Sequence, residues 1–187
     1  MRADAQRNHE RILDAAVEVF SEKGLDASLD EIALRAEVGP ATLYRHFPTR
    51  EDLVDAVIKS WIDQIQVAAD KASVSELPPH ELLADWFKTF VARISRNKGG
   101  PQKFAAAMGN PDAPSFNKCE TLREANERVL ERLRHDRVLR DGVDSLEVCR
   151  LIGAVAVVAD QAQLDEAAVE SMLDIVIDGL LRSEHAS

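Results

Sequence analysis

Apolar residues recur at intervals of three and four along most of this 187-residue chain, the spacing of amphipathic α-helices. We find no run of alternating apolar and polar residues bounded by turn residues, which would indicate a β-strand. The pattern therefore predicts an all-α protein. The expected helices are one ending at Gly24 and others at about 28–36, 40–47, 50–72, 80–94, 102–109, 116–137, 146–160 and 166–182.

Local signals in the first quarter of the chain predict where three of these helices begin and end. Ser28 stands three residues before Glu31, the spacing of a capping box. A turn at 37–39 leads to Pro40, which suits the first position of a helix, and Thr49 can cap the helix after it. Two short helices joined by a tight turn, beside an apolar first helix, are typical of a helix-turn-helix.

The side chains of this motif divide into two sets. Ala33, Val38 and Leu43 are expected to face inward, and Phe47 is expected in the core. The remaining residues of the third helix are expected on outer or flanking surfaces: Pro40, Ala41, Thr42, Tyr44, Arg45 and His46. Small residues at the start of such a helix allow the backbone to approach base edges in the major groove of DNA.

Charge argues against a general polyanion binder, because the formal net charge is −10. Residues 1–50 hold seven Lys and Arg against nine Asp and Glu, so this segment is not basic either. DNA binding is therefore predicted from pattern and not from composition. The longest apolar run, 151–159, is too short to span a bilayer, and we see no signal peptide, so a cytoplasmic protein is expected. Cys119 and Cys149 have no metal-type spacing; reduced thiols are favoured over a disulfide.

The segment SLDEIALRAEVGPATLYRHFPTREDLVDAV resembles the DNA-binding module of the tetracycline-repressor (TetR) family of transcriptional regulators. The resemblance covers about residues 8–60 and rests on apolar and aromatic positions from Ile32 to Leu53. It implies a three-helix DNA-binding domain at 1–50, a connecting helix at 50–72 and an effector-binding and dimerisation domain within 51–187. It also implies a repressor that a small molecule releases from a palindromic operator.

The resemblance further assigns roles to single residues. Phosphate contacts are implied for Ser28, Thr42, Tyr44, His46 and the basic Arg50, and base-edge contacts for Pro40, Ala41 and Arg45. Two positions depart from the family pattern. Glu37 stands where Gly is frequent, at a helix end expected to need a left-handed backbone, and Gly39 stands where Ser is frequent.

The rest of the chain resembles the family in architecture. Aromatic residues on three consecutive helices are expected either to line an effector pocket or to form plain core: Trp86, Phe87, Phe90, Phe104, Met108 and Phe116, with Trp61 and Cys119 beside them. No charge cluster marks the ligand, which suggests an uncharged or amphipathic molecule. The last two helices are very apolar, so a symmetric homodimer is favoured over a pair buried within one chain.

Two other classes of protein were weighed. A helical enzyme with a carboxylate-bridged metal would need Glu-x-x-His pairs, which the sequence lacks, and no phosphate-binding loop or nucleophile elbow occurs. We therefore expect no enzymatic activity, metal or cofactor. A helical adaptor that binds no DNA is supported mainly by the acidic net charge.

Overall fold

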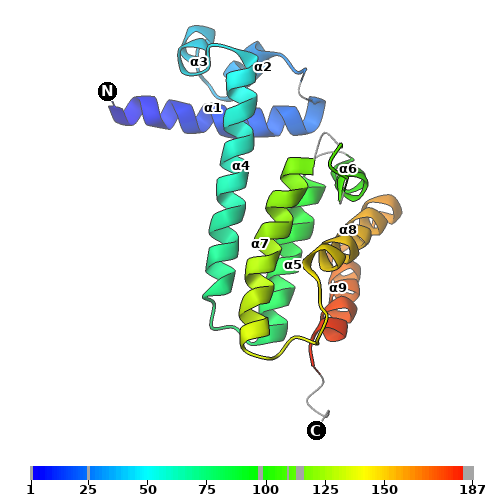
Figure 1. Cartoon of the computed structure of the whole chain (residues 1–187). Helices are drawn as coiled ribbons and strands as arrows, with labels where there is room; N and C mark the ends of the chain where they lie inside the picture. Colours follow the sequence, from blue (N-terminus) through cyan, green and yellow to red (C-terminus); the bar gives the residue numbers. More distant parts are fainter. Residues whose placement is uncertain (1, 25, 97–98, 109, 113–115, 183–187) are drawn as a thin grey trace. The chain divides into compact units, whose positions relative to one another are not determined.

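A computed structural model of the chain describes residues 2–24, 26–96, 99–108, 110–112 and 116–182. Apart from an isolated antiparallel bridge between Leu139 and Leu181, regular structure in these ranges is helical (Figure 1). The helices are α1 (Arg2–Lys23), α2 (Leu29–Arg35), α3 (Pro40–His46), α4 (Arg50–Ser73), α5 (Pro79–Ser95), α6 (Gly100–Ala107), α7 (Phe116–His135), α8 (Ser145–Ala162) and α9 (Glu166–Leu180). The all-α prediction is confirmed.

The helices form two compact units, residues 1–63 and 64–187, and the division falls within α4. The domain boundary expected after residue 50 remains a prediction. In the described ranges, no helix is both long and apolar enough to cross a membrane. The segments that join α5 to α6 and α6 to α7 lie partly outside the described residues, at 97–98, 109 and 113–115.

The core of the first unit forms where α1, α2 and α3 meet the start of α4. Its buried side chains come from each element, including Ile12, Ala16, Val19, Ile32, Ala33, Leu43, Phe47 and Leu53. The expected inward positions of Ala33, Leu43 and Phe47 are confirmed, and Val38 is half-buried against the same cluster. Burial of these residues holds α3, which at seven residues is too short to be stable alone.

In the second unit α5 packs against α8 and α9, and α6 and α7 also pack on α8. A buried polar network crosses this core. Trp86 Nε1 donates a hydrogen bond to Asn126 Oδ1 (3.0 Å), and Asn126 Nδ2 donates to Ser145 Oγ (3.1 Å). The network joins α5, α7 and α8 and satisfies polar groups that would be costly to bury alone.

Helices α7 and α9 end earlier than the sequence predicts. The helix expected to reach Arg137 ends at His135, because Arg137 has a left-handed backbone (φ 59°) and the Val138 amide donates to the Leu133 carbonyl. The helix expected to reach Arg182 ends at Leu180. Here Arg182 donates its amide to Val138 O (2.9 Å) and its Nε to Leu139 O (2.7 Å), so long-range pairing replaces the last turn.

Candidate nucleic-acid interface

The turn between α2 and α3 is closed by backbone hydrogen bonds. Glu37 is left-handed (φ 52°), its amide donates to Leu34 O (3.0 Å), and the amide of Val38 donates to Ala33 O (3.0 Å). This is a Schellman motif, which normally has Gly at the left-handed position. The sequence-based expectation that Glu37 stands at a left-handed position is confirmed. The Glu37 carboxylate pairs with Arg11 of α1, a contact that the sequence did not indicate.

Helix α3 begins at Pro40 without a side-chain cap. Gly39 is the N-cap residue, and its carbonyl accepts the amides of Thr42 (2.8 Å) and Leu43 (3.2 Å). The first turn therefore carries only a proline ring and an alanine methyl group at its exposed positions, Pro40 and Ala41. Small side chains at this end of the helix suit close approach of the backbone to DNA.

Tyr44 and Arg45 project from α3 into solvent, and 47% of the Tyr44 surface is exposed. No carboxylate in the described part of the chain forms an ion pair with Arg45. By contrast, α1 and α2 neutralise Arg35 through Glu22 (2.7 Å) and Lys23 through Glu31 (2.6 Å). Arg45 is thus an exposed cation and is available to an external acceptor.

His46 and Thr42 are half-buried flanks of the same helix. The His46 ring lies 5.8 Å from that of His9, which stacks on Phe47 at 4.9 Å. Burial lowers the pKa of His46, and the charges of His9 and Arg45 lower it further. His46 Nε2 is buried without a hydrogen-bond partner in the described residues, so the neutral ring packs on α1. A phosphate contact from His46 remains a prediction.

Ser28 and Arg50 stabilise the start of α2. Ser28 Oγ accepts a hydrogen bond from the Asp30 amide (3.2 Å), which confirms the cap, while Glu31 pairs with Lys23 and does not complete a capping box. Arg50 Nη1 donates to the Ala27 carbonyl (2.7 Å). The sequence did not indicate this bond, because its partners are 23 positions apart. DNA contacts from both residues remain predictions.

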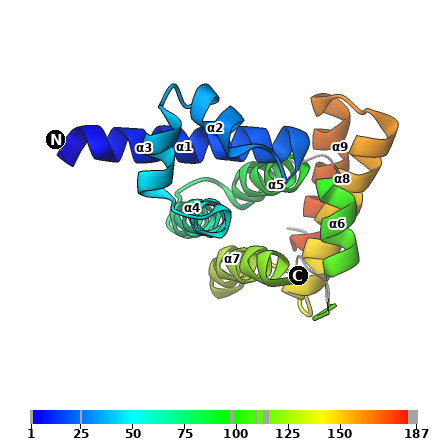
Figure 2. The ribbon, with the colours of Figure 1, turned by 90° about the horizontal axis from the view of Figure 1, so that it is seen from above.

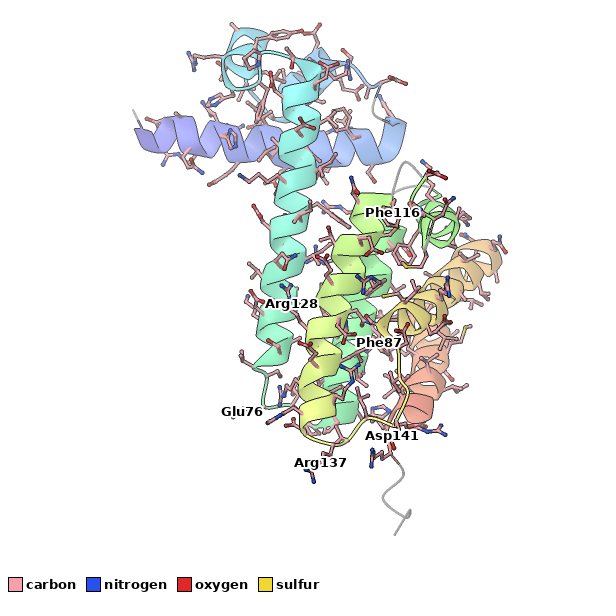
Figure 3. All side chains as sticks on the ribbon, in the orientation of Figure 1. Glu76, Phe87, Phe116, Arg128, Arg137 and Asp141 are labelled. Carbon is pink, nitrogen blue, oxygen red and sulfur yellow. The ribbon has the colours of Figure 1, made fainter. Side chains whose placement is uncertain are left out.

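The residues expected to bind an effector are divided between the two units. In the second unit Trp86, Phe87, Phe90, Phe104, Met108 and Cys119 are buried, and Phe116 is half-buried (Figure 3). Phe90 meets the Phe104 ring edge-on at 5.5 Å, and Cys119 Sγ lies 3.8 Å from the Phe104 carbonyl oxygen. Trp61 is half-buried on the part of α4 that belongs to the first unit. The effector role of these residues remains a prediction.

Both cysteines are buried and are reduced thiols, not a disulfide. Burial raises the pKa of Cys149 to about 12, which keeps this sulfur protonated at neutral pH. Gly153 on α8 lies so close to α6 that a Cβ atom there would come within 3.1 Å of the Phe104 ring. The Phe104 ring is therefore packed on both sides.

The Schellman turn, the exposed face of α3 and its packing on α1 define a helix-turn-helix DNA-binding protein. Residues 12–57 match the model of the bacterial regulatory proteins of the tetR family, and residues 78–182 match the C-terminal domain of SbtR-like transcriptional regulators. The chain belongs to the TetR family of transcriptional regulators and has an SbtR-like C-terminal domain. This family is not enzymatic.

Similar proteins agree with this assignment. The transcriptional regulator UidR of Escherichia coli is 44% identical over 59 residues, which are 31% of this chain and 30% of UidR. The match thus spans less than a third of that relative. The TetR regulator SCO0520 of Streptomyces coelicolor is 31% identical with a TM-score of 0.70, covering 94% of this chain and 99% of SCO0520. SmeT, repressor of the Stenotrophomonas maltophilia multidrug efflux pump SmeDEF, shares the fold (TM-score 0.62) at 20% identity, covering 94% of this chain and 91% of SmeT.

Replacing Glu37 with Gly is expected to stabilise the first unit by about 0.5–1 kcal/mol, because Gly adopts the left-handed backbone without a steric penalty. The exposed Arg11 pair that is lost contributes little. Removing a carboxylate from the turn is also expected to raise DNA affinity about 2- to 5-fold at low salt. Urea denaturation and fluorescence anisotropy measure the two effects.

Gln163→Gly is the matched control, since Gln163 is also left-handed (φ 51°) but belongs to the second unit. It is expected to relieve backbone strain without changing DNA affinity. Unchanged stability in Glu37→Gly would contradict the assignment of strain to this turn.

Proposed function

We propose that this TetR-family regulator is a homodimeric repressor that binds a palindromic operator and is released from it by a small molecule. The exposed face of α3 carries the proposal for recognition. Phosphate contacts from Ser28, Thr42, Tyr44, His46 and Arg50 position the helix, and Pro40, Ala41 and Arg45 meet base edges. Because the chain is acidic, binding that is not sequence-specific is weak and falls steeply with salt.

An apolar outer face on α8 and α9 supports the dimer. These helices form one side of the second unit in both Figure 1 and Figure 2. Leu151 (48% exposed) and Val158 (43%) lie on one stripe of α8 with Ala154 between them, and Ile175 (72%) is exposed on α9. Large apolar side chains that stay exposed on adjacent helices indicate a protein interface.

Charges on α9 lie along a different edge of the helix. Glu170, Asp174 and Asp178 follow one another at four-residue spacing and face α5, where Lys88 pairs with Glu170 (2.6 Å) and His80 lies 3.6 Å from Asp178. Ile175 and the small Gly179 are exposed and do not belong to this charged edge of α9. A second copy can therefore pack on an apolar face, and two-fold symmetry makes this a four-helix bundle.

Release of the operator by a small molecule is supported by the aromatic core of the second unit and by a relative of the same fold. Its core carries more aromatic side chains than the first unit, and a complex of SmeT with triclosan has the same fold. An effector that binds the operator-incompetent conformation more tightly shifts the dimer away from DNA. Two recognition helices about 34 Å apart are needed to read both half-sites.

The operator is tested with duplex DNA from beside the protein's own gene. We expect binding to a palindrome at least about 100-fold tighter than to a scrambled duplex at moderate salt. Thermal-shift screening of the dimer then identifies small molecules that stabilise it, and active compounds are added to the operator complex. Equal affinity for palindrome and scrambled DNA would exclude the repressor and favour an adaptor.

A further inference from the structure

An arginine of α5 reaches α4 within the second unit without finding an acidic partner there. Arg93 Nη2 donates to the main-chain oxygen of Gln64 at 3.4 Å, a long hydrogen bond. Arg93 Nε is buried without a hydrogen-bond partner, and no carboxylate among the described residues forms an ion pair with this guanidinium. Burial lowers the pKa of Arg93, and the charge of Arg96 adds to the shift. A partly buried cation of this kind favours an anionic ligand.

A second arginine reaches α4 from α7 (Figure 3). Arg128 Nε lies 3.9 Å from Asp70 Oδ1, too far for a hydrogen bond, and Nε and Nη2 are buried without hydrogen-bond partners in the described residues. Gln64 and Asp70 are six residues apart, about 9 Å along a helix. Arginine N–H groups without a hydrogen-bond partner in the described residues thus lie beside α4 at two positions along its length.

The stretch of α4 between these levels is apolar on its inner side. Ile65 and Ala69 are both fully buried. Further along, Arg132 Nη1 of α7 donates to the Ala72 carbonyl (3.3 Å). The polar contacts from α5 and α7 to this part of α4 are therefore made by the ends of long, flexible side chains. These arginine side chains can change conformation to admit a bound small molecule. The core between α5, α8 and α9 is not disturbed by that change.

We propose that the effector is an amphipathic small molecule with a carboxylate, which Arg93 binds while Arg128 donates to a second acceptor. This inference rests on the effector-released repressor proposed above, and it narrows the ligand from uncharged or amphipathic to acidic. A guanidinium binds a carboxylate through two parallel hydrogen bonds. The bound acid supplies the counter-ion that Arg93 lacks and places its apolar body against α4.

The test uses 2-naphthoate, 4-phenylbutyrate and decanoate, each beside its primary amide, which keeps the shape and removes the charge. Isothermal titration with the full-length dimer is expected to show binding of at least one acid and at least about 10-fold weaker binding of its amide. Arg93→Gln is expected to lower the affinity for the acid at least about 10-fold, and Arg93→Lys to lower it less. Arg128→Gln is expected to lower it about 3-fold.

Arg137→Gln is the control, since Arg137 is exposed beyond the end of α7 (Figure 3); it is expected to leave affinity unchanged. Melting temperatures of the free variants show that each one folds. Failure of every acid to bind up to about 10 mM, or equal binding of acids and amides, would overturn the inference. If only a neutral compound releases the operator, the proposed function stands and the proposal of an acidic effector is wrong. Arg93-dependent binding without operator release would keep the ligand site and overturn the release.

Discussion

Replacing Arg45 with alanine is expected to lower operator affinity by about 10- to 100-fold and to relax the sequence preference at a single base step. Arg45 is exposed on α3 and has no acidic partner among the described residues. A guanidinium that contacts a base edge discriminates between bases, so its loss removes specificity as well as affinity.

The companion change is Tyr44→Ala, which is expected to weaken binding to all DNA sequences alike, by about 5- to 30-fold. Tyr44 adjoins Arg45 and is half exposed, so its phenol is accessible to a phosphate of bound DNA. Fluorescence anisotropy against the operator and its single-base variants distinguishes the two patterns. Lys103→Ala, which removes an exposed cation from the second unit, is expected to have no effect of this kind.

Equal and sequence-blind losses from Tyr44→Ala and Arg45→Ala would contradict the division between phosphate and base contacts. If Tyr44→Ala alone shifted the base preference, the base contact would belong to Tyr44 and the phosphate contact to Arg45. Either result leaves the helix-turn-helix in place, because neither side chain belongs to the buried set that holds α3.

The second large effect is expected from Ile175→Glu, which places a charge on the apolar outer face of α9. Ile175 is 72% exposed in one chain, so the substitution leaves the fold of the chain intact and acts when a second copy packs on it. A buried, unpaired carboxylate at this position is expected to separate the dimer. Loss of the second half-site contact then lowers operator affinity at least about 100-fold.

Light scattering after size-exclusion chromatography measures the mass, and anisotropy measures DNA binding. Val74→Glu is the matched control, because Val74 is also apolar and exposed (79%) but follows α4. It is expected to remain dimeric and to bind the operator. A dimer that survives in Ile175→Glu, with unchanged affinity, would show that α9 is not the interface.

Local signals carried most of what could be predicted about the first unit. Thr49 caps the start of α4 as expected, with Thr49 Oγ1 accepting the Asp52 amide (3.1 Å), and Asp52 Oδ2 accepts the Thr49 amide in return (2.9 Å). The left-handed position of Glu37 was expected from the resemblance to the TetR family, in which Gly is frequent there. Caps and turns predicted the helix-turn-helix, because they depend on a few neighbouring residues, and the apolar and aromatic positions from Ile32 to Leu53 carried the family resemblance.

Contacts between residues far apart in sequence could not be predicted in this way. The Arg50 bond to Ala27 and the Arg11 pair with Glu37 join segments whose approach depends on the packed core. In the second unit, the same apolar spacing fits a pocket lining or a solid core, and the sequence left both open. The sequence did not single out Arg93 on α5 or Arg128 on α7, because their positions beside α4 depend on packing.

The sequence by itself thus determined the helices, the turn that joins α2 to α3 and the residues exposed on α3, because hydrophobic period and capping act within a few turns of the chain. Only the tertiary structure decided which charges are neutralised and which are left without a partner. Arg35 and Arg45 are both helix-surface arginines, yet the packing of α2 on α1 gives Arg35 a carboxylate and leaves Arg45 none among the described residues. Ion pairing depends on distances in space, and these are set only when the core has closed.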